Sequence, residues 1–183
     1  MSWVDRFFAF FREIEPTLAV VLNASSCREG WLQGEFYRHF RTDDNGFEVN
    51  RRFGDGKLPF DLCCLTTPVM IAELKVYGES GYYSKNLFGR SNIRRFLPAR
   101  AGERVPITAT DIGTLLGGAK GNSYLHDVCR LQTVSTDIER YLILVLQKAE
   151  EADNFGRAIA AVQVGTTEFD LELDAFRVRV SRF

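Results

Sequence analysis

Three ionisable residues, Asp61, Glu73 and Lys75, lie inside two of the most strand-like segments of the chain. The segment PFDLCCLTTPVMIAELKVYG, residues 59–78, reads as two short apolar strands joined by a turn over residues 66–68. Because strand side chains alternate between faces, Glu73 and Lys75 project together. With this turn, Asp61 falls directly opposite Glu73, whereas a slip of one residue would move it to the other face. The pattern therefore predicts two carboxylates and an ammonium group side by side.

Such a trio is suited to phosphodiester chemistry with a divalent cation. Mg²⁺ prefers carboxylate oxygens and waters, and it leaves coordination positions for substrate phosphate. The cation stabilises charge at the phosphorus centre, while a neighbouring ammonium group orients or activates the attacking water. From spacing alone, the alternative interpretation is a salt-bridged trio on a solvent-facing strand.

The elements around this hairpin follow a simple order. The expected elements are an amphipathic helix from Trp3 to Ile14, a short helix after Pro16, a helix from Cys27 to about Arg41, strands over 47–53, 58–65 and 69–77, a helix over 123–134, a strand over 140–147, a helix over 154–163, and a bent strand or hairpin over 167–183. Ser26 and Glu29 have the spacing of a capping box at the start of the third helix. The fold class is α/β or α+β, with a mixed central sheet flanked by helices and a core in the order α-β-β-β-α-β.

The motif and this order together resemble a known family. Phe60 and Asp61, eleven intervening residues and then Glu73-Leu74-Lys75 are similar to the motif of the PD-(D/E)xK nuclease superfamily, although Phe60 separates Pro59 from the aspartate. The resemblance implies a restriction-endonuclease-like core over residues 26–148. It also implies that Asp61 and Glu73 bind Mg²⁺, with Mn²⁺ as a possible substitute, and that Lys75 positions or activates the attacking water.

Many members of that superfamily carry a further glutamate or glutamine on the preceding helix. The candidates are Glu35, Glu29 and, less favoured, Gln33. We expect Glu35 to be the fourth catalytic residue, since Glu29 already has a structural role in the predicted capping box. The alternative for Glu35 is a helix-surface carboxylate paired with Arg38 or His39.

The segment HDVCRLQ is similar to the helix that follows the third strand in the family. Asp127 and Arg130 are therefore candidates to brace the site or to contact phosphate, and an exposed Asp–Arg pair is the alternative. His126 could assist catalysis, but a lone histidine at a helix start is more often structural.

A basic stretch lies between the third strand and that helix, in a region where the family carries a variable insertion, here residues 79–122. Its nucleic-acid-binding candidates are Lys85, Arg90, Arg94 and Arg95. Arginine contacts to phosphate would position DNA, with RNA not excluded, and cleavage of both strands of a duplex would suggest a homodimer. The alternative is a solvated loop and helix face. Because the net charge is −1, a nucleic-acid binder of this composition needs such a local patch.

The chain of 183 residues is expected to form a single nuclease-like domain. Residues 1–25 would be an N-terminal helical extension, 26–148 the core, and 149–183 a C-terminal helix and strands. The acidic alternation within 170–174 is interpreted as the solvent-facing side of an edge strand.

The cysteines, Cys63 and Cys64 among them, have no CxxC spacing, so we expect small buried thiols in a reducing cytoplasm and no zinc site. The sequence also contains no apolar run that approaches a membrane span. The function expected is that of a metal-dependent nuclease. The alternative is a noncatalytic module that keeps the nuclease fold to bind nucleic acid or protein.

Overall fold

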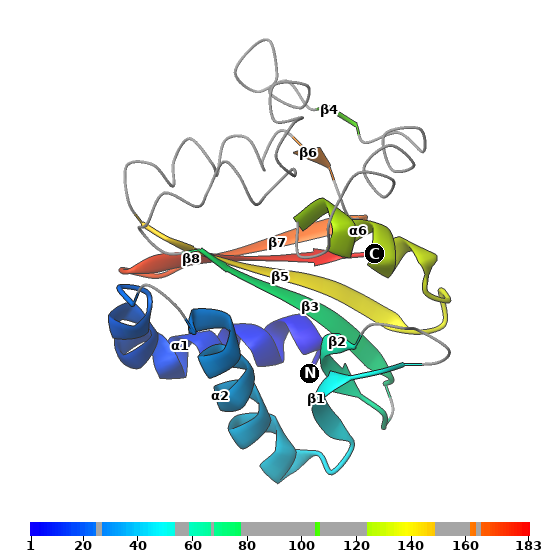
Figure 1. Cartoon of the computed structure of the whole chain (residues 1–183), viewed down its shortest axis with the longest axis horizontal. Coiled ribbons are helices and arrows are strands. Elements are labelled where there is room, and N and C mark those ends of the chain that lie inside the picture. Colours follow the sequence, from blue (N-terminus) through cyan, green and yellow to red (C-terminus); the bar gives the residue numbers. More distant parts are fainter. Residues whose placement is uncertain are drawn as a thin grey trace.

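Six strands form one mixed sheet, and helices lie on both sides of it (Figure 1). The computed structural model describes residues 1–24, 27–53, 59–66, 68–77, 105–106, 124–148, 162–163 and 166–183. The sheet contains β1 (Phe47–Arg51), β2 (Phe60–Cys64), β3 (Met70–Tyr77), β5 (Glu139–Gln147), β8 (Phe176–Arg182) and β7 (Thr167–Glu172), in that spatial order. A separate pair of short parallel strands is formed by β4 (Val105–Pro106) and β6 (Val162–Gln163).

The predicted order of helix, three strands, helix and strand is confirmed. Helix α2 (Arg28–Asp43) precedes β1, β2 and β3, and α6 (Tyr124–Thr133) precedes β5. The three consecutive strands are antiparallel neighbours, as their short links predict, whereas β3 and β5 run parallel. Parallel neighbours need a crossover connection, and α6 is the described helix of that crossover.

Helix α1 (Trp3–Val21) is continuous through Pro16, so the predicted break at the proline is wrong. Ser2 and Asp5 form a reciprocal capping box at its start. The buried stripe of this helix continues from Ile14 to Leu18 across the proline. An interior proline costs a helix about 3 kcal/mol, because it has no backbone N–H to donate to the carbonyl four residues earlier. The packing of the buried stripe offsets this cost.

The main core lies between the sheet and the pair α1 and α2, which Figure 1 shows on the same side of it. Aromatic rings dominate the contact between the helices. Phe10 stacks on Phe36 with 4.2 Å between ring centroids, and Phe7 meets Phe36 and Phe40 edge-on. Each fully buried phenylalanine contributes roughly 1.5–3 kcal/mol through its burial. The predicted N-terminal extension therefore supplies part of the central core.

The opposite side of the sheet is covered by α6, through Val128 and Leu131. Every residue of β5 between its two ends is buried, as its continuous apolar run predicts for a strand covered on both faces. Arg140, at the start of β5, donates to the carbonyls of Leu131 and Val134 at 3.2 and 3.0 Å. These bonds satisfy backbone acceptors at the end of α6 and fix that helix against the sheet.

Two local predictions at helix positions are corrected. The N-cap of α2 is Cys27, which has a left-handed backbone (φ 66°) and makes no side-chain cap hydrogen bond, so the predicted Ser26–Glu29 capping box is wrong, and Ser26 itself lies outside the described residues. Val162 and Gln163 form a strand and not the end of a helix, and the rest of that predicted helix lies outside the described residues.

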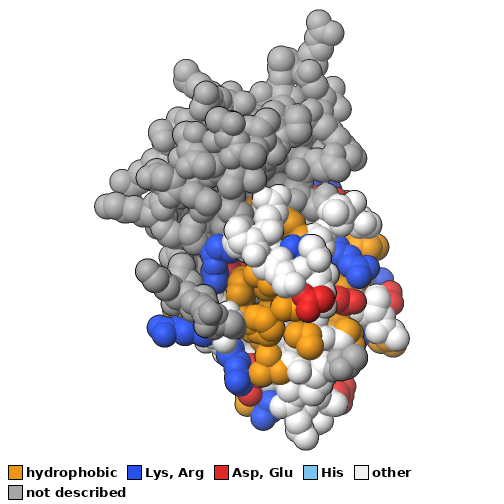
Figure 2. Space-filling view, turned by 90° about the vertical axis from the view of Figure 1, so that its right-hand side faces the viewer, with side chains coloured by type: hydrophobic (Ala, Val, Ile, Leu, Met, Phe, Trp, Pro, Cys, Tyr) orange, Lys and Arg blue, Asp and Glu red, His pale blue; other side chains and the backbone are white. Residues whose placement is uncertain are grey.

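The C-terminal segment forms the hairpin β7–β8, and β7 is an edge strand, as predicted. Asp170 and Glu172 are exposed there. On the face of the molecule in Figure 2, hydrophobic side chains gather at the centre of the described part, with basic and acidic side chains around them. This face has no field of a single sign, in line with the net charge of −1. None of the helices that the structure describes is both long enough and apolar enough to cross a membrane.

Candidate functional site

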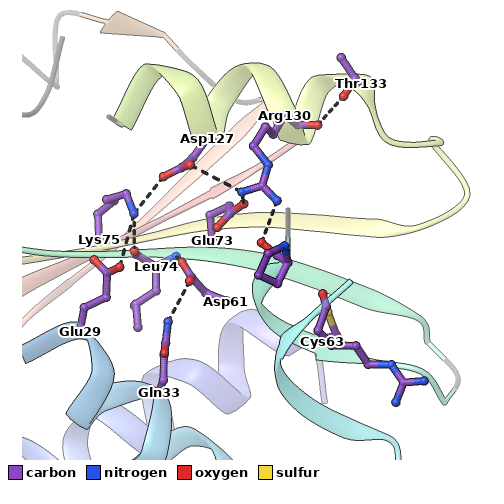
Figure 3. Close-up of polar contacts among 12 residues, drawn as sticks. Glu29, Gln33, Asp61, Cys63, Glu73, Leu74, Lys75, Asp127, Arg130 and Thr133 are labelled. Carbon is purple, nitrogen blue, oxygen red and sulfur yellow. Dashed lines mark hydrogen bonds and ion pairs between the residues drawn. The ribbon is translucent and has the colours of Figure 1, made fainter. Parts of the chain in front are cut away.

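Seven polar residues converge where β2 and β3 part, between α2 and α6 (Figure 3). We call them the charged cluster: Glu29 and Gln33 from α2, Asp61 from β2, Glu73 and Lys75 from β3, and Asp127 and Arg130 from α6. Three of them are almost fully buried, since Glu73, Lys75 and Asp127 are only 2, 8 and 3% exposed. Charged side chains are seldom buried to this degree unless they are paired.

Asp61 lies at the point where the β2–β3 ladder ends. The pairs run from Cys64 and Met70 to Leu62 and Ala72, which is the register predicted from the turn. The next position places Asp61 opposite Glu73. There the backbone N–H of Leu74 donates to Asp61 Oδ2 at 2.7 Å, so a carboxylate takes the place of a strand carbonyl as acceptor. The other oxygen, Oδ1, accepts from Gln33 Nε2 at 2.8 Å.

Glu73 points toward α6 and contacts Arg130. Arg130 Nη1 lies 2.6 Å from Glu73 Oε1, although this oxygen has no hydrogen bond of good geometry. The contact places the Arg130 guanidinium directly against the Glu73 carboxyl group. Arg130 also donates to the carbonyl of Pro59 at 2.8 Å, and its guanidinium lies 4.5 Å from the centre of the Phe60 ring.

Lys75 lies among acceptors from three elements. Its Nζ is 3.0 Å from Asp127 Oδ2 and 3.6 Å from Glu29 Oε1, and it donates to the carbonyl of Leu74 at 3.1 Å. Asp127 Oδ1 also lies 4.0 Å from Arg130 Nη1. Helix α6 therefore contributes directly to the cluster. Asp127 and Arg130 do not form the exposed pair that was the alternative interpretation of the sequence.

The electrostatics of the cluster favour protons on two of its carboxylates. Burial, together with the carboxylates of Asp127 and Asp61, raises the pKa of Glu73 far above its usual value, and Arg130 opposes this only in part. Burial also raises the pKa of Glu29 to about 7, although Lys75 lowers it and its side chain is 39% exposed. A carboxyl group with such a pKa holds a proton unless a cation takes its place.

Lys75 stays charged in these surroundings. Burial alone would lower its pKa, but the carboxylates of Asp127, Glu29 and Asp61 outweigh burial and raise it. Cys63 lies close by, and burial together with the Glu73 carboxylate raises the pKa of its thiol to about 12. A thiol with this pKa is not a nucleophile at neutral pH, so Cys63 is a structural residue.

The charges of the cluster do not balance. Its described residues include four carboxylates, on Glu29, Asp61, Glu73 and Asp127, and two cations, on Lys75 and Arg130. Full ionisation would leave an excess of two negative charges, which two protons or one divalent cation would neutralise. Within the described residues no three histidine, cysteine, aspartate or glutamate side chains are grouped as metal ligands. Mg²⁺, however, is usually bound by one or two carboxylates, with waters and substrate phosphate completing its shell.

Glu35 does not join the cluster. It forms two hydrogen bonds with Arg38, at 2.9 and 2.8 Å, on the surface of α2. The preference for Glu35 over Glu29 is therefore reversed by the geometry. Glu29 precedes the buried residues Gln33 and Phe36 by four and seven positions, so it lies on the buried face of α2, at the end that faces the fork between β2 and β3.

Gln33 contacts the cluster more directly than its sequence position indicates, and Asn50 is a neighbour of the cluster that was not predicted. Gln33, the least favoured of the helix candidates, is buried and bonded to Asp61. Asn50 donates to Gln33 Oε1 at 2.9 Å from within β1. A signal was present in the sequence, because asparagine is disfavoured inside strands and enriched at left-handed backbone positions.

Several predicted residues cannot be placed. Lys85, Arg90, Arg94 and Arg95, and the insertion over 79–122 apart from β4, lie outside the described residues. His126 lies within α6, but its side chain is outside the described part of the structure. Among the described cysteines, Cys63 and Cys64 are buried as expected, whereas Cys27 is exposed.

Comparisons with known proteins gave no match. This holds for protein-family models, for curated proteins and for solved structures. A functional assignment for this chain has to be argued from the charged cluster and the elements that hold it.

Proposed function

We propose that this protein is a metal-dependent nuclease with a restriction-endonuclease-like core that hydrolyses phosphodiester bonds, most favourably in DNA. The proposal rests on the excess of two carboxylates over cations in the charged cluster. A divalent cation would neutralise that excess, and the carboxylates nearest to the β2–β3 fork are the two that the family motif designates as ligands. Buried groups with strongly shifted pKa values cluster at functional sites more often than elsewhere.

The arrangement of the core supports the same family. Helix α2 is followed by three antiparallel neighbours, and α6 leads into a strand parallel to β3. The motif residues lie on the two central strands of this unit, with Asp61 on β2 and Glu73 and Lys75 on β3. Rigid strands are suited to hold metal ligands in fixed positions.

The donor set fits Mg²⁺ or Mn²⁺. Asp61 and Glu73 would hold the ion, and Glu29 would contribute to its neutralisation from α2. Asp61 uses one lone pair on each oxygen for Gln33 and Leu74, which leaves further lone pairs for an ion. When bound, the cation would supply positive charge to the phosphate undergoing hydrolysis.

The chain's own cations have separate roles in this proposal. The raised pKa of Lys75 keeps it an ammonium group, so it would orient the attacking water by donating a hydrogen bond and would not take up its proton. Arg130 would exchange its contact with Glu73 for a contact with substrate phosphate, since guanidinium groups bind phosphate in a forked geometry.

One observation favours a second candidate, a noncatalytic module that binds nucleic acid or protein. Glu73 is already paired with Arg130, and Lys75 with Asp127, so the catalytic groups are engaged with each other. A module that had lost its metal could keep this arrangement as a structural network. Cleavage assays separate the two candidates, because only the nuclease depends on a metal ion.

The test is to incubate supercoiled plasmid, single-stranded DNA and RNA with the protein in Mg²⁺, Mn²⁺ or EDTA. We expect cleavage with either metal and none in EDTA, and we expect Asp61→Ala and Lys75→Ala to abolish it. Lys148→Ala is the matched control, because Lys148 pairs with Glu172 at an exposed site and should leave cleavage intact. Binding of nucleic acid without cleavage under any metal would favour the noncatalytic module.

A further inference from the structure

A chain of two amides leads from the edge strand β1 to the carboxylate of Asp61. Asn50 Nδ2 donates to Gln33 Oε1 at 2.9 Å, and Gln33 Nε2 donates to Asp61 Oδ1 at 2.8 Å. Gln33 is buried, while Asn50 is exposed. Neither residue belongs to the motif from which the nuclease function was argued. We call Asn50 and Gln33 the amide relay.

The direction of the relay follows from the chemistry of its members. An ionised carboxylate only accepts hydrogen bonds, so the amide nitrogen of Gln33 has to face Asp61. The amide oxygen of Gln33 then faces Asn50, which has to present its own nitrogen. Each member can therefore take only one orientation. Asp61 determines which end of the Gln33 amide faces it, and the donor at position 50 holds the other end.

The backbone at Asn50 is unusual for a residue within a strand. Its φ is 50°, in the left-handed region, although its neighbours Val49 and Arg51 pair regularly with β2. Asparagine is one of the few residues other than glycine that adopts this conformation readily. Backbone outliers of this kind persist where the surrounding structure holds them in place, and they often lie at functional sites.

The Asp61 carboxylate is held from two directions. Gln33 bonds to Oδ1, and the backbone N–H of Leu74 bonds to Oδ2 at 2.7 Å. Together these two donors fix the plane of the carboxylate at the end of the β2–β3 ladder. If Gln33 turned its amide, its oxygen would face Asp61 Oδ1, and the hydrogen bond to that oxygen would be lost.

We propose that Asn50 is a positioning residue that sets, through Gln33, the orientation of the Asp61 carboxylate for metal binding. Its importance for metal binding rests on the proposed function, whereas its effect on Asp61 does not. Asn50 touches neither metal nor substrate in this account. It acts by supplying a donor that holds the oxygen end of the Gln33 amide and so restrains the nitrogen end against Asp61.

Two substitutions test the relay. Asn50→Asp keeps the size of the side chain and its tolerance of a left-handed backbone, but replaces the donor by an acceptor. Gln33 then faces an acceptor at both ends, and its amide is no longer held in one orientation. Asn50→Gly keeps the backbone conformation and removes the side-chain amide. This variant tests the relay if Asn50→Asp does not fold. Asn45→Asp is the control, because it adds the same charge at an exposed position outside the relay.

The first readout needs neither metal nor substrate. Hydrogen exchange of the Leu74 amide reports on its bond to Asp61, and the Ile143 amide at the centre of β5 reports on the stability of the sheet. We expect Leu74 to exchange about fivefold faster in both Asn50 variants, with Ile143 unchanged, since one hydrogen bond contributes about 1 kcal/mol. Exchange at Leu74 equal to that of the wild type in a folded Asn50 variant would overturn the relay.

The second readout is the affinity for Mn²⁺ measured by calorimetry. A negative charge added at position 50 should tighten Mn²⁺ binding if it acts only through its field. The relay predicts the opposite sign, namely binding about fivefold weaker in Asn50→Asp and weaker also in Asn50→Gly. Tighter binding in Asn50→Asp with unchanged Leu74 exchange would overturn the proposal.

The two readouts keep the relay and the nuclease function distinguishable. If the wild type binds no Mn²⁺ and cleaves no nucleic acid, the proposed function fails, while faster Leu74 exchange would still support the effect of Asn50 on Asp61. If the wild type binds Mn²⁺ and cleaves DNA, and the Asn50 variants do so equally well, the function stands and the positioning role of Asn50 is overturned.

Discussion

The β7–β8 hairpin and the charged cluster both place acidic and basic side chains on neighbouring strands, but they bury them to different degrees. On the hairpin, Arg179 forms two hydrogen bonds with Asp170, at 2.7 and 2.9 Å, and Arg177 pairs with Glu172. The acids of these pairs, Asp170 and Glu172, have side chains 43 and 50% exposed. In the cluster, the side chains of Glu73 and Asp127 are 3 and 4% exposed.

The difference in burial changes what these charges do. An exposed ion pair contributes from zero to about 1 kcal/mol, because water screens it and each partner is solvated when the pair breaks. A buried charge costs several kcal/mol to desolvate, and good geometry offsets that only when the charges balance. The hairpin is therefore a solvated edge that suits the border of a sheet. The cluster, with two negative charges in excess, is suited to bind a cation.

The largest expected effect comes from removing Lys75. Lys75→Met should destabilise the fold by about 3 kcal/mol, because it leaves the buried Asp127 carboxylate without its closest cation. Cleavage should fall by about a thousandfold or more, as expected for loss of a group that acts at the reacting centre. Urea unfolding and single-turnover cleavage would measure the two effects.

Lys148→Met is the control for Lys75→Met, because Lys148 pairs with Glu172 of the exposed hairpin. Lys148 lies 3.4 Å from Glu172, and the two side chains are 43 and 50% exposed. Its loss should change the free energy of unfolding by less than about 1 kcal/mol. Equal destabilisation by the two lysine variants would remove the distinction between the cluster and the hairpin.

A second prediction concerns the pH dependence of stability without metal. The folded-state pKa values of Glu73 and Glu29 lie above the ordinary value of 4.5, so the folded protein holds protons that the unfolded chain has released. The stability from these groups is complete below about pH 4.5 and falls as the pH rises. The part due to Glu29 is lost by about pH 7, while the part due to Glu73 continues to fall above that.

Glu73→Gln should flatten this profile. The amide needs no proton to stay neutral, so the slope should decrease by up to about 1.4 kcal/mol per pH unit above neutrality. Glu172→Gln on the hairpin should leave the slope unchanged. Urea unfolding at a series of pH values would show the effect, and a wild-type profile that rises with pH through this range would speak against a buried, protonated Glu73.

The smallest expected effect separates the two glutamates of α2. Glu29→Gln should weaken metal binding and reduce cleavage, because Glu29 points toward Lys75 in the cluster. Glu35→Gln should leave cleavage within about twofold and stability within about 0.5 kcal/mol, since Glu35 forms only a helix-surface pair with Arg38. A larger loss of cleavage with Glu35→Gln than with Glu29→Gln would restore the preference drawn from the sequence.

Much of the fold was predictable because short links and alternation determine local pairing. The turn expected over 66–68 implies the same register that the β2–β3 ladder has. The alternation of side chains between the two faces of β3 places Glu73 and Lys75 on one face. The apolar run of β5 indicated burial on both faces. These features depend on neighbours along the chain, which a sequence contains directly.

The wrong or missing predictions concern the ends of helices and contacts between elements that are far apart in the sequence. Glu35 was preferred to Glu29 because Glu29 was assigned to a capping box at the start of α2, and the helix begins without that box. Helix α1 continues through Pro16 with Ile14 and Leu18 buried on either side of the proline. Asn50 lies next to Gln33 because β1 and α2 bring the two side chains together. The spacing of residues along the chain does not determine contacts of this kind between separate elements.

The most direct test of the central claim is a calorimetric titration of Mn²⁺ at about pH 6.5, in two buffers that differ in their ionisation enthalpy. The account predicts that one ion binds and that about two protons are released, because the cation replaces the protons held by Glu73 and Glu29. Asp61→Asn should abolish this binding. A wild-type protein that binds no Mn²⁺, or binds it without releasing protons, would contradict the account.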